Sequence, residues 1–344
     1  MIADIRLQQY RSYLDKTFSL SPGLNIVVGP NASGKTNLLE AIMVISSGKS
    51  YRAPDSDLIM HNKDWARIDA TTESGTRVLK LSKQRQEKEF LINDKAYKRL
   101  NTNQQIPIVL FEPNHLLMLS GSPELRRGYL DGILDLIKPG YKKTRNAYIK
   151  TLRQRNALLK SGSSSTAELF PWNVRLSHLG GVIAASRHEL VNELNSNINQ
   201  AYTNISKGKE SITLNYKATV SLNNYESQLL NILDQTMDLD LLRGFTANGP
   251  HREDVEILID DKPPSSVASR GEARTITIVL KTVESEIIED ILNVKPVILL
   301  DDVFSELDKS RTKQLEAFLI RYQSIITTTD THLFVESKQN VINT

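Results

Sequence analysis

The stretch that decides the fold is residues 29–36, which read Gly29-Pro30-Asn31-Ala32-Ser33-Gly34-Lys35-Thr36 and complete the pattern G-x-x-x-x-G-K-[ST]. The preceding residues, 24–28, are mostly apolar and β-branched, which predicts a buried strand. Residues 36–42 place apolar side chains at helical spacing, so the loop opens a helix. An ordinary Gly-rich turn is the alternative, but a strand, this loop and a helix in succession predict a nucleotide-binding site.

Each part of this phosphate-binding loop has an expected role towards a nucleoside triphosphate. Gly29 and Gly34 let backbone amides close around the α- and β-phosphates, and the helix N-terminus adds its positive end. Lys35 is expected to reach the β- and γ-phosphates. Thr36 is expected to offer its hydroxyl to Mg²⁺, which prefers hard oxygen ligands.

Composition sets limits on the class of protein. The chain has 344 residues, 40% hydrophobic and 24% charged, and no cysteine, so it can form a sizeable core but neither disulfides nor thiolate metal sites. We expect one large domain plus a subdomain. Residues 1–7 alternate as a strand does and no later segment approaches a membrane span, which predicts a cytoplasmic protein without a membrane partner. The net charge of +3 is too small to imply nucleic-acid binding by itself.

A second chemical element lies far along the chain. Residues 296–300 form a short apolar run after a proline, and Asp301 and Asp302 follow at its carboxyl end, where open α/β sheets bind ligands. This pattern is typical of a Walker B strand, in which Asp301 would hold Mg²⁺ through water and Asp302 would orient or activate the hydrolytic water. The alternative is a solvated strand end. Lys35, Asp301 and Asp302 are the expected catalytic residues, and a helix over 309–322 and a strand over 323–329 are expected next.

A third element lies between these two. Residues 268–274 place Ser269 and Gly271 at the start of a strongly periodic helix, expected over 273–292. The stretch resembles the signature motif of ABC-type ATPases, although a plain N-cap gives the same pattern. The resemblance implies that Ser269, Gly271 and the helix N-terminus bind the γ-phosphate held by a second subunit, so that two sites are completed in a homodimer.

The whole chain resembles the RecF family of bacterial DNA repair proteins. The stretches that carry this resemblance are 10–13, 34–42, 48–52, 111–113, 121–127, 249–254 and 299–308. The resemblance implies an ABC-type head related to SMC proteins, with ATP and Mg²⁺ as cofactors, slow hydrolysis that resets an ATP-dependent homodimer, and binding of double-stranded and gapped DNA. It also implies a RecR-type mediator partner, the loading of recombinase, and nucleotide contacts from Arg11 and Asn37.

Two positions depart from the family pattern. Glu272 stands where the family usually has glutamine, and a carboxylate near a γ-phosphate is repulsive unless it turns away. Asn114 replaces a residue that is usually acidic. These departures put the strength of the dimer and the identity of the partners in question.

The expected fold class is therefore α/β: an ABC-type P-loop ATPase head with a β-rich arm and an inserted helical subdomain lacking a long coiled coil. We expect residues 1–122 to form the N-terminal part of the head with the phosphate-binding loop and the β arm. Residues 123–207 read as the helical subdomain and 208–344 as the C-terminal part of the head. About forty helical residues span roughly 60 Å, far less than an SMC protein needs.

The expected DNA contacts come from two basic clusters, each of which can also be a solvated face. The first, taken to lie on one helix, includes Lys142, Lys143, Arg145 and Arg153, which we expect to bind DNA, together with Lys138, Lys150 and Arg155. The second lies on the β arm: Lys83, Arg85, Lys88, Lys95, Lys98 and Arg99. Arg126 and Arg127 are as suited to holding the subdomain as to binding DNA. His251 is expected to be a buried, hydrogen-bonded turn residue rather than a catalytic one.

Two other functions fit part of the pattern. A transporter ATPase subunit would share the nucleotide site, but the signature lacks the usual Ser-Gly-Gly-Gln form and the helical region is basic. Another SMC-like head for chromosome maintenance would carry long coiled coils or a fused nuclease domain. A DNA-repair ATPase of the RecF kind fits the sequence best.

Overall fold

The computed structural model describes residues 1–84, 87–161, 166–206, 208–304, 308–329 and 339–344. The chain forms two compact units. The first unit comprises Met1–His115, Asn204–Ser206 and Glu284–Thr344, and the second comprises Leu116–Thr203 and Lys207–Val283.

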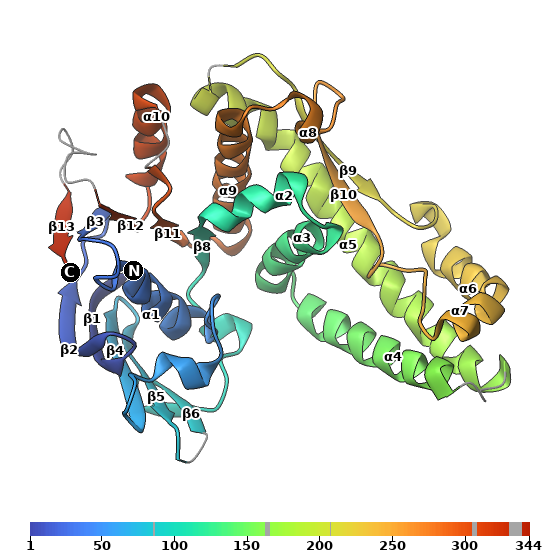
Figure 1. Ribbon diagram of the computed structural model, residues 1–344, viewed down its shortest axis with the longest axis horizontal. Helices are drawn as coiled ribbons and strands as arrows, with labels where there is room; N and C mark the ends of the chain where they lie inside the picture. The colour runs from blue at the N-terminus through green and yellow to red at the C-terminus, as the bar shows by residue number, and fades with distance from the viewer. Residues whose placement is uncertain (85–86, 162–165, 207, 305–307, 330–338) are drawn as a thin grey trace. The chain divides into compact units, whose positions relative to one another are not determined.

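A five-stranded sheet in the first unit carries the phosphate-binding loop. Its strand order is β13-β3-β12-β11-β8, and every neighbouring pair is parallel. The strands are β3 (Leu24–Val28), β8 (Ile108–Phe111), β11 (Val297–Asp301), β12 (Ser324–Thr328) and β13 (Asn340–Asn343). Segments from both ends of the chain thus lie side by side in one sheet (Figure 1). Parallel pairing brings the carboxyl ends of these strands to one edge, where the loop, Asp301 and Asp302 lie.

The β-rich arm of the first unit is a six-stranded antiparallel sheet in the order β2-β1-β4-β5-β6-β7. Its strands are β1 (Ile2–Tyr10), β2 (Tyr13–Ser19), β4 (Trp65–Thr72), β5 (Gly75–Ser82), β6 (Glu87–Ile92) and β7 (Lys95–Tyr97). One core joins this sheet, the parallel sheet and helix α1 (Lys35–Ser47), and it includes Ile5, Leu39, Leu79 and Leu299. The two sheets therefore share the helix that follows the phosphate-binding loop, and the arm forms part of the same hydrophobic core.

Short helices complete the first unit. They are η1 (Asp55–Leu58), η2 (Thr102–Gln104) and α10 (Lys309–Leu319), and the long helix α9 (Arg270–Leu292) ends in it. The α10 helix begins where a helix was expected but ends three residues early, because Ile320 begins a turn that leads into β12. Three residues of the stretch 299–308, which carried the family resemblance, lie outside the described part of the chain: Ser305, Glu306 and Leu307.

The second unit is mainly helical, and it also takes in Lys207–Val283, beyond the segment 123–207 for which a helical subdomain is expected. It contains α2 (Leu117–Ser120), α3 (Pro123–Ile137), α4 (Tyr141–Ser161), most of α5 (Thr166–Ser206), α6 (Tyr225–Gln235), α7 (Met237–Arg243) and α8 (Pro264–Val267). An antiparallel pair, β9 (Ile212–Lys217) and β10 (Asp254–Ile259), lies among them, and short turns η3 (Pro113–Leu116) and η4 (Leu222–Asn224) precede α2 and α6. At 41 residues, α5 is about 60 Å long, well short of an SMC coiled coil. Among the described residues, no helix has the length and apolar character that crossing a membrane requires.

Candidate nucleotide-binding site

The phosphate-binding loop joins the fully buried strand β3 to α1. Gly34 is the N-cap of α1 with φ 103°, a left-handed conformation that favours glycine. A Cβ on Gly34 would also lie 2.8 Å from Ser12 Oγ and 2.8 Å from Tyr13 Oη. The second glycine of the motif is thus required both by its backbone angle and by the close approach of the β1–β2 turn.

The side chain of Lys35 is bound by backbone carbonyl groups of the phosphate-binding loop. The side chain is 9% exposed, and Nζ donates to the carbonyl oxygens of Gly29 at 2.7 Å and Pro30 at 2.9 Å. Buried ammonium groups need such partners. The contacts keep the positive charge beside the amides that open α1, where it suits a phosphate ligand.

Oxygen ligands from three elements meet at the carboxyl edge of the parallel sheet. Thr36 Oγ1 donates to Asp301 Oδ1 at 3.0 Å, and Thr327 Oγ1 donates to the same oxygen at 2.8 Å. Thr327 Oγ1 in turn accepts from the backbone N–H of Asp302 at 3.0 Å. A hydroxyl and a carboxylate held together in this way are the hard oxygen donors that Mg²⁺ takes from a protein when phosphates and waters supply the rest. The donor set therefore fits Mg²⁺ at Thr36 and Asp301.

Asp302 adopts an unusual backbone conformation. Its φ is 50°, in the left-handed region that non-glycine residues seldom occupy, and its side chain is exposed. Such conformations cluster at functional sites, where the surrounding structure maintains them. Together with its position after Asp301, this geometry favours a functional role over that of a plain strand end.

The turn between β1 and β2 supports the loop from the side. The guanidinium of Arg11 donates two hydrogen bonds of 2.8 Å to the fully buried carboxylate of Glu40 on α1, and these bonds raise the pKa of Arg11 above its usual value. Asn37 Nδ2 donates to Ser12 Oγ at 2.9 Å, and Tyr13 Oη donates to the carbonyl of Gly34 at 3.0 Å. Burial raises the pKa of Tyr13 to about 12, so it remains a donor. Arg11 is thus held against α1 by Glu40, with its side chain 24% exposed.

An open groove of about 870 Å³ begins beside these residues. Arg11, Ser12 and Asn37 line it together with residues 56, 57 and 59–64 and Lys83. The groove is large enough for the nucleoside part of a nucleotide whose phosphates lie in the loop.

Two residues without an expected role in the site, Glu112 and Tyr51, lie near this edge. The pairing of Leu300 with Phe111 places Glu112 next to Asp301, one residue beyond the paired strand ends. Burial, and then the negative charge of Asp301, raise the pKa of Tyr51. Both residues occur in stretches that carried the family resemblance, but only the register of β8 against β11 reveals the position of Glu112.

Ser269 and Gly271 lie in the second unit, at the start of α9. Ser269 and Glu272 form a reciprocal capping pair: the Ser269 N–H donates to Glu272 Oε2 at 2.7 Å, and the Glu272 N–H donates to Ser269 Oγ at 3.2 Å. The carboxylate of Glu272 therefore lies back on its own helix end. A Glu at this position stabilises the helix, since the carboxylate lies near the positive end of the helix dipole.

The basic cluster around α4 divides into exposed and paired side chains. Lys143, Lys150 and Arg153 are exposed and Lys142 is half-buried. Arg145 is half-buried and pairs with Asp135. Lys138 lies at the end of α3, outside α4, and pairs with Glu189 at 2.6 Å, so the placement of all seven residues on one helix is wrong. Of the β-arm cluster, Lys83, Lys95, Lys98 and Arg99 are exposed, Lys88 pairs with Asp55, and Arg85 lies outside the described residues.

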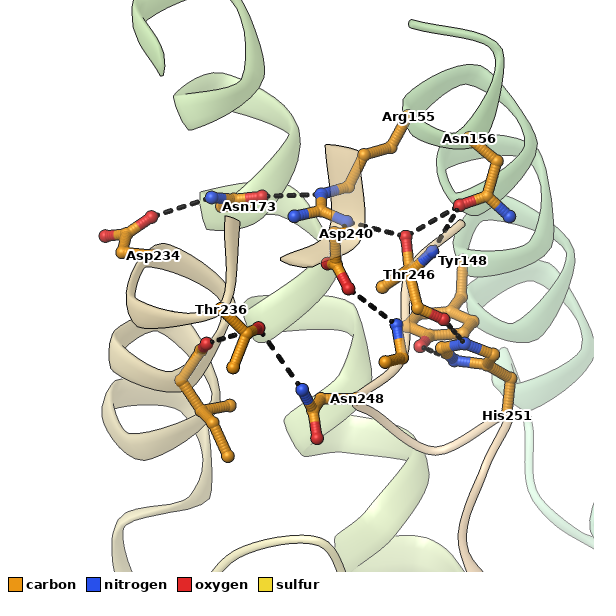
Figure 2. Close-up of polar contacts among 12 residues, drawn as sticks. Tyr148, Arg155, Asn156, Asn173, Asp234, Thr236, Asp240, Thr246, Asn248 and His251 are labelled. Carbon is orange, nitrogen blue, oxygen red and sulfur yellow. Dashed lines mark hydrogen bonds and ion pairs between the residues drawn. The ribbon is translucent and has the colours of Figure 1, made fainter. Parts of the chain in front are cut away.

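Arg155 is fully buried, so the interpretation that it belongs to a DNA-contacting face is wrong. Figure 2 shows its guanidinium at the centre of a polar network in the second unit. Nη1 donates to Asp240 Oδ2 at 2.8 Å and to Thr246 Oγ1 at 2.7 Å, and Nε donates to Asn173 Oδ1 at 2.7 Å. Asn173 continues the network to Asp234. A buried arginine requires such partners, and they link α4, α5, α6 and α7.

His251 is a hydrogen-bonded turn residue, as expected, although it is half-buried rather than buried (Figure 2). Its Nε2 lies 3.0 Å from the carbonyl of Thr246 and must carry the proton, so Nδ1 accepts from Tyr148 Oη at 2.7 Å. Burial lowers the pKa of His251 to about 4 and keeps the ring neutral. The neighbouring Gly249 has φ 125°, and a Cβ there would lie 2.6 Å from Tyr148 Oη.

Arg126 and Arg127 bind the segment that follows His251. Arg126 donates two hydrogen bonds of 2.8 Å to Asp254, and Arg127 Nη1 donates to the carbonyl of Glu253 at 2.6 Å. Two of the stretches that carried the family resemblance, 121–127 and 249–254, therefore meet in the second unit and hold it together.

The comparisons with known proteins agree along the whole chain. A family model described as RecF/RecN/SMC N terminal domain matches residues 1–344. A protein named DNA replication and repair protein RecF from Gloeobacter violaceus is 33% identical over 350 residues, which cover 97% of this chain and 93% of the relative. The protein of the same name from Streptococcus equi subsp. equi is 35% identical over 345 residues, covering 95% and 91%.

Solved structures give the same result for the fold. A structure described as the recombination mediator protein RecF-ATPrS in the RecFOR pathway has a TM-score of 0.89 at 29% identity and covers 99% of this chain and 96% of that chain. Its RecF-ATP counterpart has a TM-score of 0.86 at 30% identity, covering 97% and 93%. A likeness that concerns the fold alone is found to an Smc head bound to the C-winged helix domain of ScpA, with TM-score 0.56, 16% identity, and coverage of 96% and 90%. The prediction of an α/β ABC-type ATPase head is confirmed.

Proposed function

Because the chain belongs to the RecF family of DNA replication and repair proteins, we propose that it is an ATPase of recombinational repair whose nucleotide state controls dimer formation and DNA binding. The observation that carries this proposal is the junction of Thr36, Asp301 and Thr327 beside the phosphate-binding loop. It brings the loop and the Walker B strand to one point, as ATP hydrolysis requires.

Nucleotide binding is assigned to residues of the first unit. The amides of residues 29–36 hold the phosphates, Lys35 neutralises the β- and γ-phosphates, and the groove beside Arg11 and Asn37 takes the nucleoside. The two bonds to Glu40 favour Arg11 as an ordered, positively charged part of the groove rather than a mobile one. Relatives described as RecF-ATP and RecF-ATPrS support ATP as the nucleotide.

Hydrolysis is assigned to the carboxyl edge of β11. Thr36 and Asp301 would hold Mg²⁺, which supplies charge neutralisation of the phosphates when bound. Asp302 follows directly and has an exposed carboxylate, so it can orient or deprotonate the attacking water. Slow turnover suits a switch in which bound ATP maintains the dimer and ATP hydrolysis restores the monomer.

Dimer formation is assigned to Ser269, Gly271 and the N-terminus of α9. A helix end with a capping serine offers amide donors for an anion, so it can bind the γ-phosphate held by a second copy of the chain. In the capping pair the carboxylate of Glu272 accepts the Ser269 N–H, and it would lie close to that phosphate. We therefore expect a weaker dimer than one with glutamine at position 272.

DNA binding is assigned to basic residues on α4, principally the exposed Lys143 and Arg153 and the half-buried Lys142, with Arg145 contributing less because it is paired with Asp135. Such residues contact phosphates without reading sequence, which suits gapped and duplex DNA. The relatives described in the RecFOR pathway support a RecR-type mediator as the protein partner and the loading of recombinase as the outcome. We place this activity in the cytoplasm, where the chromosome is repaired.

The proposal is tested by sedimentation and by ATP hydrolysis measured on one preparation. Analytical ultracentrifugation with Mg²⁺ and ATP, with Mg²⁺ and ADP, and without nucleotide is expected to give a dimer only with ATP. Duplex DNA carrying a single-stranded gap is expected to raise the hydrolysis rate. A chain that stays monomeric in saturating ATP would contradict the shared-site mechanism, and a chain that does not bind ATP would contradict the proposal as a whole.

A further inference from the structure

The last strand of the parallel sheet leads to the back of the phosphate-binding loop. β13 pairs with β3 in parallel register from Asn340 with Asn25 to Asn343 with Val28. The next residue, Thr344, continues the pairing, because its N–H donates to the carbonyl of Val28 at 3.1 Å. Thr344 therefore stands beside the point where β3 enters the loop.

The side chain of Thr344 reaches a residue of the loop itself. Its Oγ1 lies 2.6 Å from Oγ of Ser33, a hydrogen-bond distance, and 3.3 Å from the carbonyl of Val28, to which it donates. Ser33 precedes Gly34 and also makes a turn bond from its N–H to the carbonyl of Pro30 at 3.3 Å. The hydroxyl pair thus links the edge strand to the segment of the loop that opens α1.

The first glycine of the loop is explained by the same contact. Gly29 does not adopt a left-handed backbone, yet a Cβ there would lie 2.2 Å from Thr344 Oγ1 and 2.5 Å from Ser33 Oγ. Real Cβ atoms do not approach other atoms so closely. The hydroxyl pair occupies the space of the missing side chain, so it contacts both ends of the loop.

We propose that Thr344 is a positioning residue for nucleotide binding, which acts by bonding Ser33 and holding the phosphate-binding loop in its anion-binding shape. The inference rests on the proposed nucleotide site and adds a residue that does not touch the ligand. A loop held in its bound shape binds phosphate more tightly, since less conformational freedom is lost on binding. One hydrogen bond of this kind contributes about a fivefold to tenfold change in affinity.

The affinity test compares four chains: the wild type, Ser33→Ala, Thr344→Ala and the double variant. The dissociation constant for a fluorescent ATP analogue is measured with Mg²⁺. Each single variant is expected to bind about fivefold to tenfold more weakly, and the double variant no more weakly than either single one, because both changes remove the same bond. Thr344→Ser, which keeps the hydroxyl, is expected to restore wild-type affinity, and Val341→Thr, an exposed change on the same strand, to leave it unaltered.

A second measurement needs no nucleotide. Hydrogen–deuterium exchange of the amides of residues 30–36 in the nucleotide-free protein is expected to be faster in Thr344→Ala than in the wild type or Thr344→Ser. Wild-type affinity in Thr344→Ala, additive losses in the double variant, or unchanged exchange would each overturn the positioning role. A failure of the proposed nucleotide site is distinguishable, because the wild type itself would then not bind the analogue while the exchange comparison would still report on the loop.

Discussion

The hydroxyl of Thr36 donates a hydrogen bond of 3.0 Å to Oδ1 of Asp301, although 265 residues separate the two in the chain. The contact joins the first turn of α1 to the end of β11, and Thr327 on β12 donates to the same oxygen. Two neighbouring strands and one helix therefore converge at the carboxyl edge of the parallel sheet. The chemistry assigned to this protein depends on that convergence.

Removal of the Thr36 hydroxyl is expected to weaken the contribution of the metal to nucleotide binding. Thr36→Val keeps the shape of the side chain but loses the hard oxygen donor, so the difference in ATP affinity between Mg²⁺ and EDTA should shrink, by about tenfold for a lost ligand interaction near 1.4 kcal/mol. Isothermal titration calorimetry with Mg²⁺ and with EDTA measures this difference in ATP affinity. Lys35→Ala is the comparison, since it should abolish binding in both. An undiminished effect of Mg²⁺ in Thr36→Val would exclude Thr36 as a ligand.

Asp302→Asn is expected to separate binding from hydrolysis. The substitution preserves size and hydrogen bonding but removes the proposed base, so kcat should fall roughly 10²-fold to 10⁴-fold while the dissociation constant for ATP stays within about twofold. Because ATP then persists, the protein should accumulate as a dimer, which sedimentation detects. If Asp302→Asn hydrolyses ATP at the wild-type rate, another group activates the water. If it stays monomeric in saturating ATP, the two-copy mechanism is wrong.

Ser269→Arg is expected to block dimer formation without affecting the nucleotide site of the single chain. A long cation at the start of α9 would occupy the space that the proposed γ-phosphate contact needs, and it would also break the capping bond with Glu272. ATP affinity should remain at the wild-type value while the ATP-dependent dimer is lost in sedimentation. Ser265→Arg is the matched control, because Ser265 is also exposed, on the short helix α8. Equal loss of the dimer in both variants would argue for a nonspecific charge effect.

The nucleotide site could be predicted from local sequence because its parts are local. The loop, the strand before it and the helix after it are contiguous, and Asp301 directly follows its own strand. The spacing of apolar residues and the loop motif are therefore enough to identify these segments. Likewise, a turn at residues 73–74 separates β4 from β5, and one at 93–94 separates β6 from β7. These features can be predicted without knowing which distant segments of the chain lie close together in the fold.

Contacts between distant segments could not be predicted in the same way. Arg155 belongs to a basic run, and only the position of Asp240, 85 residues away, makes it a buried structural residue. Glu112 comes next to Asp301 through the register of β8 against β11. The bond of Ser33 to Thr344 depends on pairing of the last strand with the strand before the loop. In each case a charged or polar residue takes its role from a partner that sequence spacing does not identify.

Arg153 and Arg155 provide a matched test of DNA binding, because they lie two residues apart and differ in burial. Arg153→Ala is expected to lower DNA affinity and to reduce by about one the slope of the logarithm of the binding constant against the logarithm of salt concentration. The free energy of unfolding should change by less than about 0.5 kcal/mol. Arg155→Ala leaves Asp240 buried without its partner and should cost roughly 3–5 kcal/mol of unfolding free energy. Fluorescence anisotropy at several salt concentrations and urea unfolding separate the two effects. An unaltered salt slope in Arg153→Ala would exclude this face of α4.

His251 is expected to make the stability of the protein fall in mild acid. Its pKa is lowered to about 4 by burial, whereas an unfolded chain has the ordinary value near 6.5, so below pH 6.5 the unfolded state takes up a proton that the folded state does not. The stabilisation is complete above pH 7 and is lost as the pH falls, by about 2 kcal/mol at pH 5. Urea unfolding of the wild type and of His251→Gln at pH 7.5 and pH 5 measures this difference. Because glutamine does not titrate, the stability advantage of the wild type should shrink at pH 5, and an unchanged advantage would mean that the ring is protonated in the folded protein.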